Sequence, residues 1–253
     1  MATVKKNLLE VCIEGLEFPL KVGRKSKTEG ENTLVTISVS ARIEKKFEEQ
    51  FETNILGIIC NSDDYVGLQQ LSNKIVSYLN SIDARSIDLI FSFPFFIEKC
   101  PRNTRQKHSM KYKCQFKVTK NSSFDYSRNY LVEIPVILKE YLMPGIQKEI
   151  LDIPALLQIE MEGFDVYFIE DIVELVENQF EKLNSSPFSI FDDNNRFSLL
   201  EKLENKLSEE FNTDRCTVKL ITRKMLYSFS LGLSGERYKP SLIDEYETEH
   251  IFV

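Results

Sequence analysis

Three stretches in which apolar and polar residues strictly alternate constrain the fold of this chain most strongly. They cover residues 34–43, 87–95 and 111–118. A period of two residues is typical of a β-strand that buries one face and exposes the other. We therefore expect a sheet with one apolar and one polar face.

The rest of the chain predicts further strands and four helices. The tripeptide at 61–63, Asn-Ser-Asp, is a good N-cap for the second helix, whose apolar residues recur at helical spacing. The polar segment 24–32 is expected to be a loop, and a Pro-Gly break at 144–145 is expected to follow the end of a strand. Further strands are predicted over 11–23, 131–138, 155–162, 216–221 and 226–233, and helices over 53–59, 68–82, 170–183 and 197–211.

The predicted elements follow one order twice, ββααββ and then ββααββ again. Such an order favours an α+β fold, with an antiparallel sheet and helices packed on one face. We expect a first module over residues 1–122 and a second over 123–253. The second module ends in an acidic tail that begins at Pro240 and contains Asp244, Glu245, Glu247 and Glu249.

The cysteine content, the net charge and the distribution of apolar residues indicate what class of protein this is. The 253 residues contain five widely spaced cysteines and no CxxC motif, which favours a reduced, cytoplasmic protein over a disulfide framework. The net charge of -7 argues against a surface that grips nucleic acid as a whole. No apolar run is long enough to span a membrane, and we expect no signal peptide.

Four strings, in this order, resemble the GTP cyclohydrolase IB family. They are GLEFPLKV at 15–22, IDLIFSFPFFIEKCP at 87–101, EIPVILKEYLMPGIQKEI at 133–150 and VYFIEDIVELVENQF at 166–180. The resemblance extends from about Gly15 to Gly235. It implies a subunit built from two tandem tunnelling-fold modules, each of the order ββααββ.

The resemblance also implies a metal site that this chain lacks. In the family, a metal-bound water opens the guanine ring, and the metal needs thiolate or imidazole ligands. Met143 and Gly145 stand where the family has cysteines, and Tyr227 and Phe229 stand where it has a histidine pair. Of the metal-side residues only Glu177 remains, so we expect no metal or other cofactor and identify no catalytic residue.

Three functions are compatible with these residues. The first is a divergent cyclohydrolase-like pseudoenzyme, a regulatory or structural subunit or one that binds a purine-like or phosphorylated small molecule. The second is an active enzyme that converts GTP to dihydroneopterin triphosphate, or one with metal-free chemistry around Glu177. The third is an RNA-binding module that uses the basic loop Arg102–Lys113. Because open sheets leave unpaired edges, we also expect a homo-oligomer.

The candidate site residues each have a simpler structural interpretation. Glu177 is a metal-ligand remnant, a purine contact or a solvated helix carboxylate. Arg102, Arg105 and Lys107, in the basic segment 99–113, bind phosphate or belong to a solvated hairpin loop. The spacing of Cys100, His108 and Cys114 matches no zinc motif, and Cys114 is expected to pack as a small hydrophobic residue.

Overall fold

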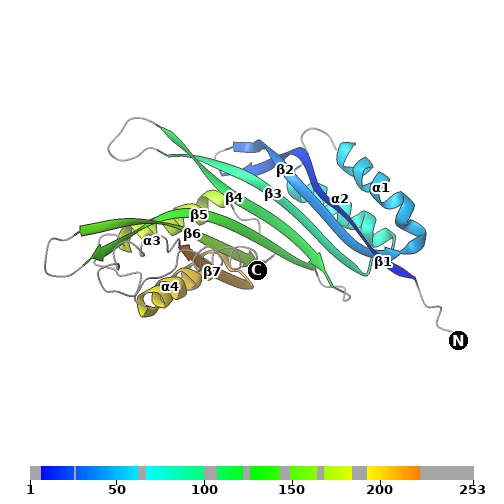
Figure 1. The fold of residues 1–253 in the computed structure, drawn as a ribbon. Helices are drawn as coiled ribbons and strands as arrows, with labels where there is room; N and C mark the ends of the chain where they lie inside the picture. The colour runs from blue at the N-terminus through cyan, green and yellow to red at the C-terminus, as the bar shows by residue number, and fades with distance from the viewer. Residues whose placement is uncertain are drawn as a thin grey trace, which may run out of the picture.

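The computed structural model describes residues 7–25, 27–61, 67–99, 107–121, 126–142, 149–163, 168–183 and 193–222, and its described strands form one antiparallel sheet. The seven strands lie in the sheet in the order in which they occur in the chain (Figure 1). They are β1 (Leu8–Arg24), β2 (Lys27–Glu44), β3 (Ser86–Lys99), β4 (His108–Lys120), β5 (Tyr126–Leu142), β6 (Glu149–Glu162) and β7 (Arg215–Thr222). The predicted α+β class and the antiparallel sheet are confirmed.

The alternating stretches form the buried face of the sheet, as predicted. On β3, five apolar residues at every second position are buried, while the residues between them are partly exposed. The register pairs Phe91 with Phe116 on β4, and their ring centroids lie 6.2 Å apart. Cross-strand pairs of this kind stabilise a sheet and fix its register, because a slip of one residue would turn the apolar side chains to solvent.

In the described part of the chain, four helices cover this buried face. They are α1 (Glu48–Cys60), which follows a short 3-10 turn at Lys45–Phe47, α2 (Leu68–Ser81), α3 (Ile169–Leu183) and α4 (Asp193–Phe211). Helices α1 and α2 contact β1 and α2 also contacts β3, whereas α3 contacts β5 and α4 contacts β7 (Figure 1). Each helix presents an apolar stripe to the sheet. On α2 this stripe comprises Leu68, Leu71, Ile75 and Leu79.

The sheet continues without interruption from the first half of the chain to the second. Strand β4 pairs with β5 from Lys113 opposite Glu133 to Lys120 opposite Tyr126. The observed order is ββααββ for the first half and ββααβ for the described part of the second. The strand predicted at 226–233 and the acidic tail lie outside the described residues, and the division at 122/123 stays a prediction.

The predicted loop at 24–32 is wrong for most of its length. Strand β1 runs to Arg24, and β2 begins at Lys27, with Val22 opposite Glu31 in the ladder. The polar residues of this hairpin belong to a β-ladder whose register shifts between Val22 and Arg24. Gly30 adopts φ +72 there, and a Cβ atom would lie 2.7 Å from the Val22 carbonyl oxygen, so this position requires glycine.

Strand β5 covers the strand predicted at 131–138 and is described as far as Leu142, next to the Pro-Gly break. The break itself lies outside the described residues. Among the described helices, none combines the length and the apolar character that crossing a membrane requires.

The packing of α2 on the sheet yields a stability prediction. The Ile75 side chain is fully buried in the core, so Ile75→Ala should lower the free energy of unfolding by about 2–5 kcal/mol through lost burial and the cavity left behind. Lys74→Ala, at the exposed neighbouring position, should change it by no more than about 0.5 kcal/mol. Urea denaturation followed by circular dichroism measures both, and equal effects would contradict this packing.

Candidate functional site

Glu177 is the candidate residue around which the described structure gathers other polar side chains. It lies in the middle of α3, on a helix whose buried stripe of Ile172, Val176 and Phe180 faces the sheet. Glu170 and Asp171 in the first turn suit the positive end of the helix dipole. The side chain of Glu177 is 37% exposed, so part of it is in contact with solvent.

Two donors from the first half of the chain meet the same oxygen of Glu177. The Lys99 ammonium at the end of β3 forms an ion pair with Oε1, and the Tyr112 hydroxyl on β4 donates a hydrogen bond to Oε1 over 3.1 Å. The ammonium also lies 5.5 Å from the centroid of the Tyr112 ring. This trio, Lys99, Tyr112 and Glu177, is called the Glu177 cluster below.

Tyr112 is the rigid member of the Glu177 cluster. Its side chain is fully buried, and burial, followed by the charge of Glu177 and the hydrogen bond to it, raises the pKa of the phenol above its usual value. The hydroxyl therefore stays protonated and donates at any pH near neutrality. A buried tyrosine hydroxyl needs a partner, and this one has Glu177.

The sequence analysis named Glu177 and the basic segment that begins at Lys99, but it did not predict a contact between them. It predicted Tyr112 only as a residue of a strand. The alternation along β4 places Tyr112 on the buried face, which the helices cover. Because a buried tyrosine hydroxyl needs a hydrogen-bond partner, its position could have indicated a polar residue on one of those helices. Lys25 likewise forms an ion pair with Asp171 across a long stretch of chain. Among the described residues, helix α3 thus has polar contacts with Lys25, Lys99 and Tyr112 of the first half of the chain.

The basic segment 99–113 is partly neutralised by carboxylates. In addition to the Lys99 pair, Lys107 lies 3.0 Å from Glu98, and Lys113 lies 3.5 Å from Glu133. Arg102 and Arg105 lie outside the described residues, so their predicted role as phosphate ligands stays a prediction. Lys107, whose side chain is 68% exposed, forms this ion pair at the surface, where such pairs contribute little to folding stability.

The positions at which the resemblance implies lost metal ligands cannot be compared with this geometry. Met143, Gly145, Tyr227 and Phe229 lie outside the described residues, as does Cys100. Within the described ranges, no three His, Cys, Asp or Glu side chains come together in a way that could hold a metal ion. At Glu177, one carboxylate oxygen is already held by an ammonium and a hydroxyl, which is a poor arrangement for a divalent cation.

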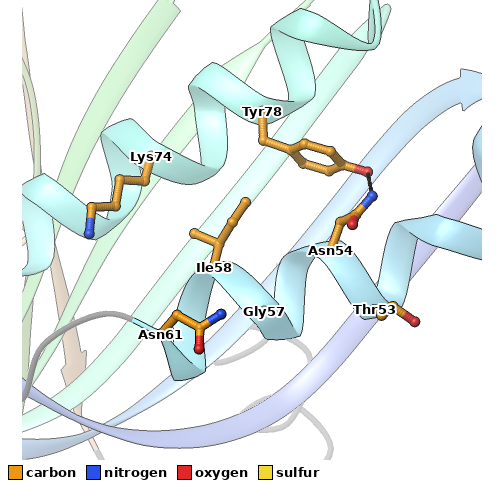
Figure 2. A pocket seen from close by; sticks show the side chains of 7 residues that line it. All are labelled: Thr53, Asn54, Gly57, Ile58, Asn61, Lys74 and Tyr78. Atoms are coloured by element: carbon orange, nitrogen blue, oxygen red, sulfur yellow. Dashed lines mark hydrogen bonds between the residues drawn. The ribbon is translucent and has the colours of Figure 1, made fainter.

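A second feature is a groove of about 550 Å³ on the outer surface between α1 and α2 (Figure 2). Its lining residues are Thr53, Asn54, Gly57, Ile58, Asn61, Lys74 and Tyr78. The Asn54 amide donates to the Tyr78 hydroxyl over 3.0 Å and so links the two helices. The groove includes none of the predicted ligand-binding residues.

Glu170, the second residue of α3, has a carboxylate whose two oxygens are buried. Both of its oxygens are shielded from solvent and accept no hydrogen bond from the described residues. Its charge contributes, after burial itself and the charge of Glu133, to raising the pKa of the buried Cys114 thiol. A buried polar group without a partner costs stability and calls for an explanation.

Replacing Glu170 by an apolar side chain of similar length tests whether its burial destabilises the fold. Glu170→Met should raise the free energy of unfolding by about 1–3 kcal/mol, because an unpaired buried carboxylate is removed. Glu174→Met, at an exposed position on the same helix, is the control and should be nearly neutral. A loss of stability in Glu170→Met would show that the carboxylate has a stabilising partner.

The cysteines differ in accessibility, and this difference predicts their reactivity. Cys12 and Cys60 are exposed, Cys114 is buried as predicted, and Cys216 is partly buried with a pKa raised by burial to about 11. Since the thiolate is the reactive form, a raised pKa slows alkylation at neutral pH. With iodoacetamide at pH 8, mass spectrometry should find Cys12 and Cys60 modified well before Cys114 and Cys216. Early modification of Cys114 would contradict its burial.

Comparison with known proteins relates the chain to one group of enzymes. It is 22% identical over 227 residues to GTP cyclohydrolase FolE2 of Citrifermentans bemidjiense, covering 88% of this chain and 82% of that relative. It is 25% identical over 176 residues to GTP cyclohydrolase FolE2 of Thermosipho africanus, covering 68% and 66%. No protein-family model matches the chain.

Among solved structures, uricase from Arthrobacter globiformis superposes with a TM-score of 0.50 at 9% identity, covering 88% of this chain and 96% of the uricase chain. At this identity the likeness concerns the fold alone. It agrees with the continuous antiparallel sheet and the helices on one face. The chain therefore has a tunnelling-type α+β fold, and along most of its length it is similar to GTP cyclohydrolase-type proteins.

Proposed function

We propose that this protein binds a guanine nucleotide beside Glu177 and acts on it as a GTP cyclohydrolase-type enzyme. The observation that carries this proposal is the similarity to proteins named GTP cyclohydrolase over 88% of the chain. The Glu177 cluster supports it, since it presents a partly exposed carboxylate acceptor on a rigid setting of β3, β4 and α3. Carboxylates accept the N–H groups of a guanine ring well.

A second candidate is a protein of the same type that binds the nucleotide without opening its ring. The sequence favours it at specific positions, because Met143 and Gly145 replace the cysteines and Tyr227 and Phe229 replace the histidine pair that the resemblance implies. The whole chain contains two histidines, His108 and His250. In this candidate the protein acts as a regulatory or structural subunit of a divergent branch of the cyclohydrolase IB group.

The metal that the resemblance implies does not fit the described part of the site. Lys99 and Tyr112 take up one oxygen of Glu177, and the described residues place no second or third ligand beside it. A metal ion held by a single carboxylate would bind weakly, since metal affinity depends on the number of ligands. We derive the proposed binding from the side chains alone, with Glu177 as acceptor.

The remaining parts of the proposal concern assembly and place in the cell. The outer edge of β1 pairs with no strand among the described residues, and long unpaired edges invite association with another chain. We propose a cytoplasmic homo-oligomer on this ground and on the free-cysteine composition. The two modules, over 1–122 and 123–253, are proposed to share the continuous sheet.

Incubation of the purified protein with GTP separates the two candidates. The first candidate predicts that formate and a fluorescent pterin product are released. Glu177→Gln should then lower the rate of formate release by about 10²-fold or more if the carboxylate contacts the reacting ring. Glu174→Gln, an exposed carboxylate one turn earlier on α3, is the matched control and should keep the wild-type rate.

Calorimetric titration with GTP completes the test. Stoichiometric binding without formate, in the presence of added Mn²⁺ or Zn²⁺ as well as EDTA, identifies the second candidate. If wild-type protein neither binds GTP nor releases formate, both candidates are wrong.

A further inference from the structure

We propose that the groove between α1 and α2 is a second binding site, which takes a small organic anion built on a planar ring. The groove shares no residue with the Glu177 cluster, so this inference goes beyond the proposed function and does not depend on it. Its volume of about 550 Å³ lies within the range that is usual for pockets that hold small molecules.

The first support is the positive charge of Lys74 on α2. Its side chain is exposed and lies at the same end of the groove as Asn61, the residue that follows α1 (Figure 2). In the described part of the chain, the Lys74 ammonium forms no ion pair with a carboxylate. The C-terminal end of α1 and the N-terminal end of α2 both lie toward this end, so their opposite dipoles offset each other. The ammonium and the Asn61 amide can therefore donate to the anionic group of a ligand.

The charges on α1 give the ligand a direction along the groove. Glu48 and Glu49 lie in the first turn of α1, and Glu52 comes directly before the lining residue Thr53. These carboxylates are therefore nearer to the end of the groove that is away from Lys74. An anionic group is repelled from that end and attracted to the Lys74 end.

The second support is Gly57, which lies in the floor of the groove inside α1 (Figure 2). A glycine inside a helix costs stability relative to alanine. Neither packing nor the backbone requires it here, because a Cβ atom would meet no atom within 4 Å and the φ angle is not positive. The absent side chain leaves the helix backbone accessible beside Ile58, and a planar ring can lie on such a surface.

The third support is the hydrogen bond from the Asn54 amide to the Tyr78 hydroxyl, over 3.0 Å. This bond joins the two helices at the end of the groove away from Lys74 (Figure 2). Tyr78 follows Lys74 by about one helical turn, which separates the two residues by about 6 Å along the axis of α2. That length suits one ring with an anionic group at one end and a hydroxyl at the other.

The experiment uses para-hydroxybenzoate as the probe and its neutral amide, para-hydroxybenzamide, as the control for charge. Full-length protein is titrated with each, and NMR follows the side-chain amide signals of Asn54 and Asn61, which report on the groove itself. In wild type, both signals should shift with para-hydroxybenzoate, which should bind about tenfold or more tightly than the neutral amide. Lys74→Met should weaken binding of the anion about tenfold and remove this preference.

A titration with phenyl phosphate identifies the anionic group. If phenyl phosphate binds more tightly than para-hydroxybenzoate, the site takes a phosphate, and the reverse order identifies a carboxylate. Either order supports the inference, provided that Lys74→Met weakens the binding.

Two further variants separate binding from folding. Gly57→Leu fills the floor with a residue that favours a helix, so it should weaken binding of para-hydroxybenzoate about tenfold while the melting temperature stays the same or rises. Lys206→Met removes an exposed lysine of α4 and should leave the affinity unchanged. Thermal unfolding of each variant shows whether it is folded.

The inference is overturned if wild type binds the anion and the neutral amide equally. It is also overturned if neither amide signal shifts with para-hydroxybenzoate or phenyl phosphate, or if Lys74→Met and Gly57→Leu both bind like wild type. None of these results bears on GTP binding or formate release, which test the proposed function separately.

Discussion

The pairing of β4 with β5 is the constraint on which the rest of this structure depends. Through it, the strands of the first half and those of the second form one sheet, and both helix pairs cover the same face. Helix α3 packs on β5, so the pairing also brings α3 close to the ends of β3 and β4. Without this ladder, nothing would hold Glu177 close to Lys99 and Tyr112.

Contacts between α3 and the first half of the chain differ in what they contribute. The ion pair of Lys25 with Asp171 involves an exposed lysine, and such pairs add little to stability. The hydrogen bond from the buried Tyr112 hydroxyl is different, because leaving that group unpaired would be costly. Burial thus makes the Glu177 cluster a specific junction between the two halves, whereas the surface pair is replaceable.

The similarity to GTP cyclohydrolase-type proteins concerns the fold, whereas the site is defined by a few side chains. The similarity to proteins named GTP cyclohydrolase extends along 88% of the chain and supports a common fold. At the Glu177 cluster, the structure shows a carboxylate that is paired with the Lys99 ammonium and the Tyr112 hydroxyl. A fold can be kept while the chemistry placed on it changes, because packing constrains the core and only a few side chains form the site.

Much of the fold was predictable because it depends on local periodicity. The alternation at 34–43, 87–95 and 111–118 appears as buried and exposed faces of β2, β3 and β4, and the helical spacing of Leu71, Ile75 and Leu79 appears as the core stripe of α2. The strands within 24–32 were wrongly predicted to be a loop, because main-chain pairing, unlike burial, leaves no pattern in polar residues.

By itself, the sequence determined the fold class, the order of the elements in the described residues and the buried status of residues such as Cys114. It also pointed to Glu177 as a candidate. Only the tertiary structure decided which donors meet that carboxylate, since Lys99, Tyr112 and Glu177 come from three elements that are distant in the chain. Register and helix packing bring them together, and neither can be read from the spacing of residues along a single segment.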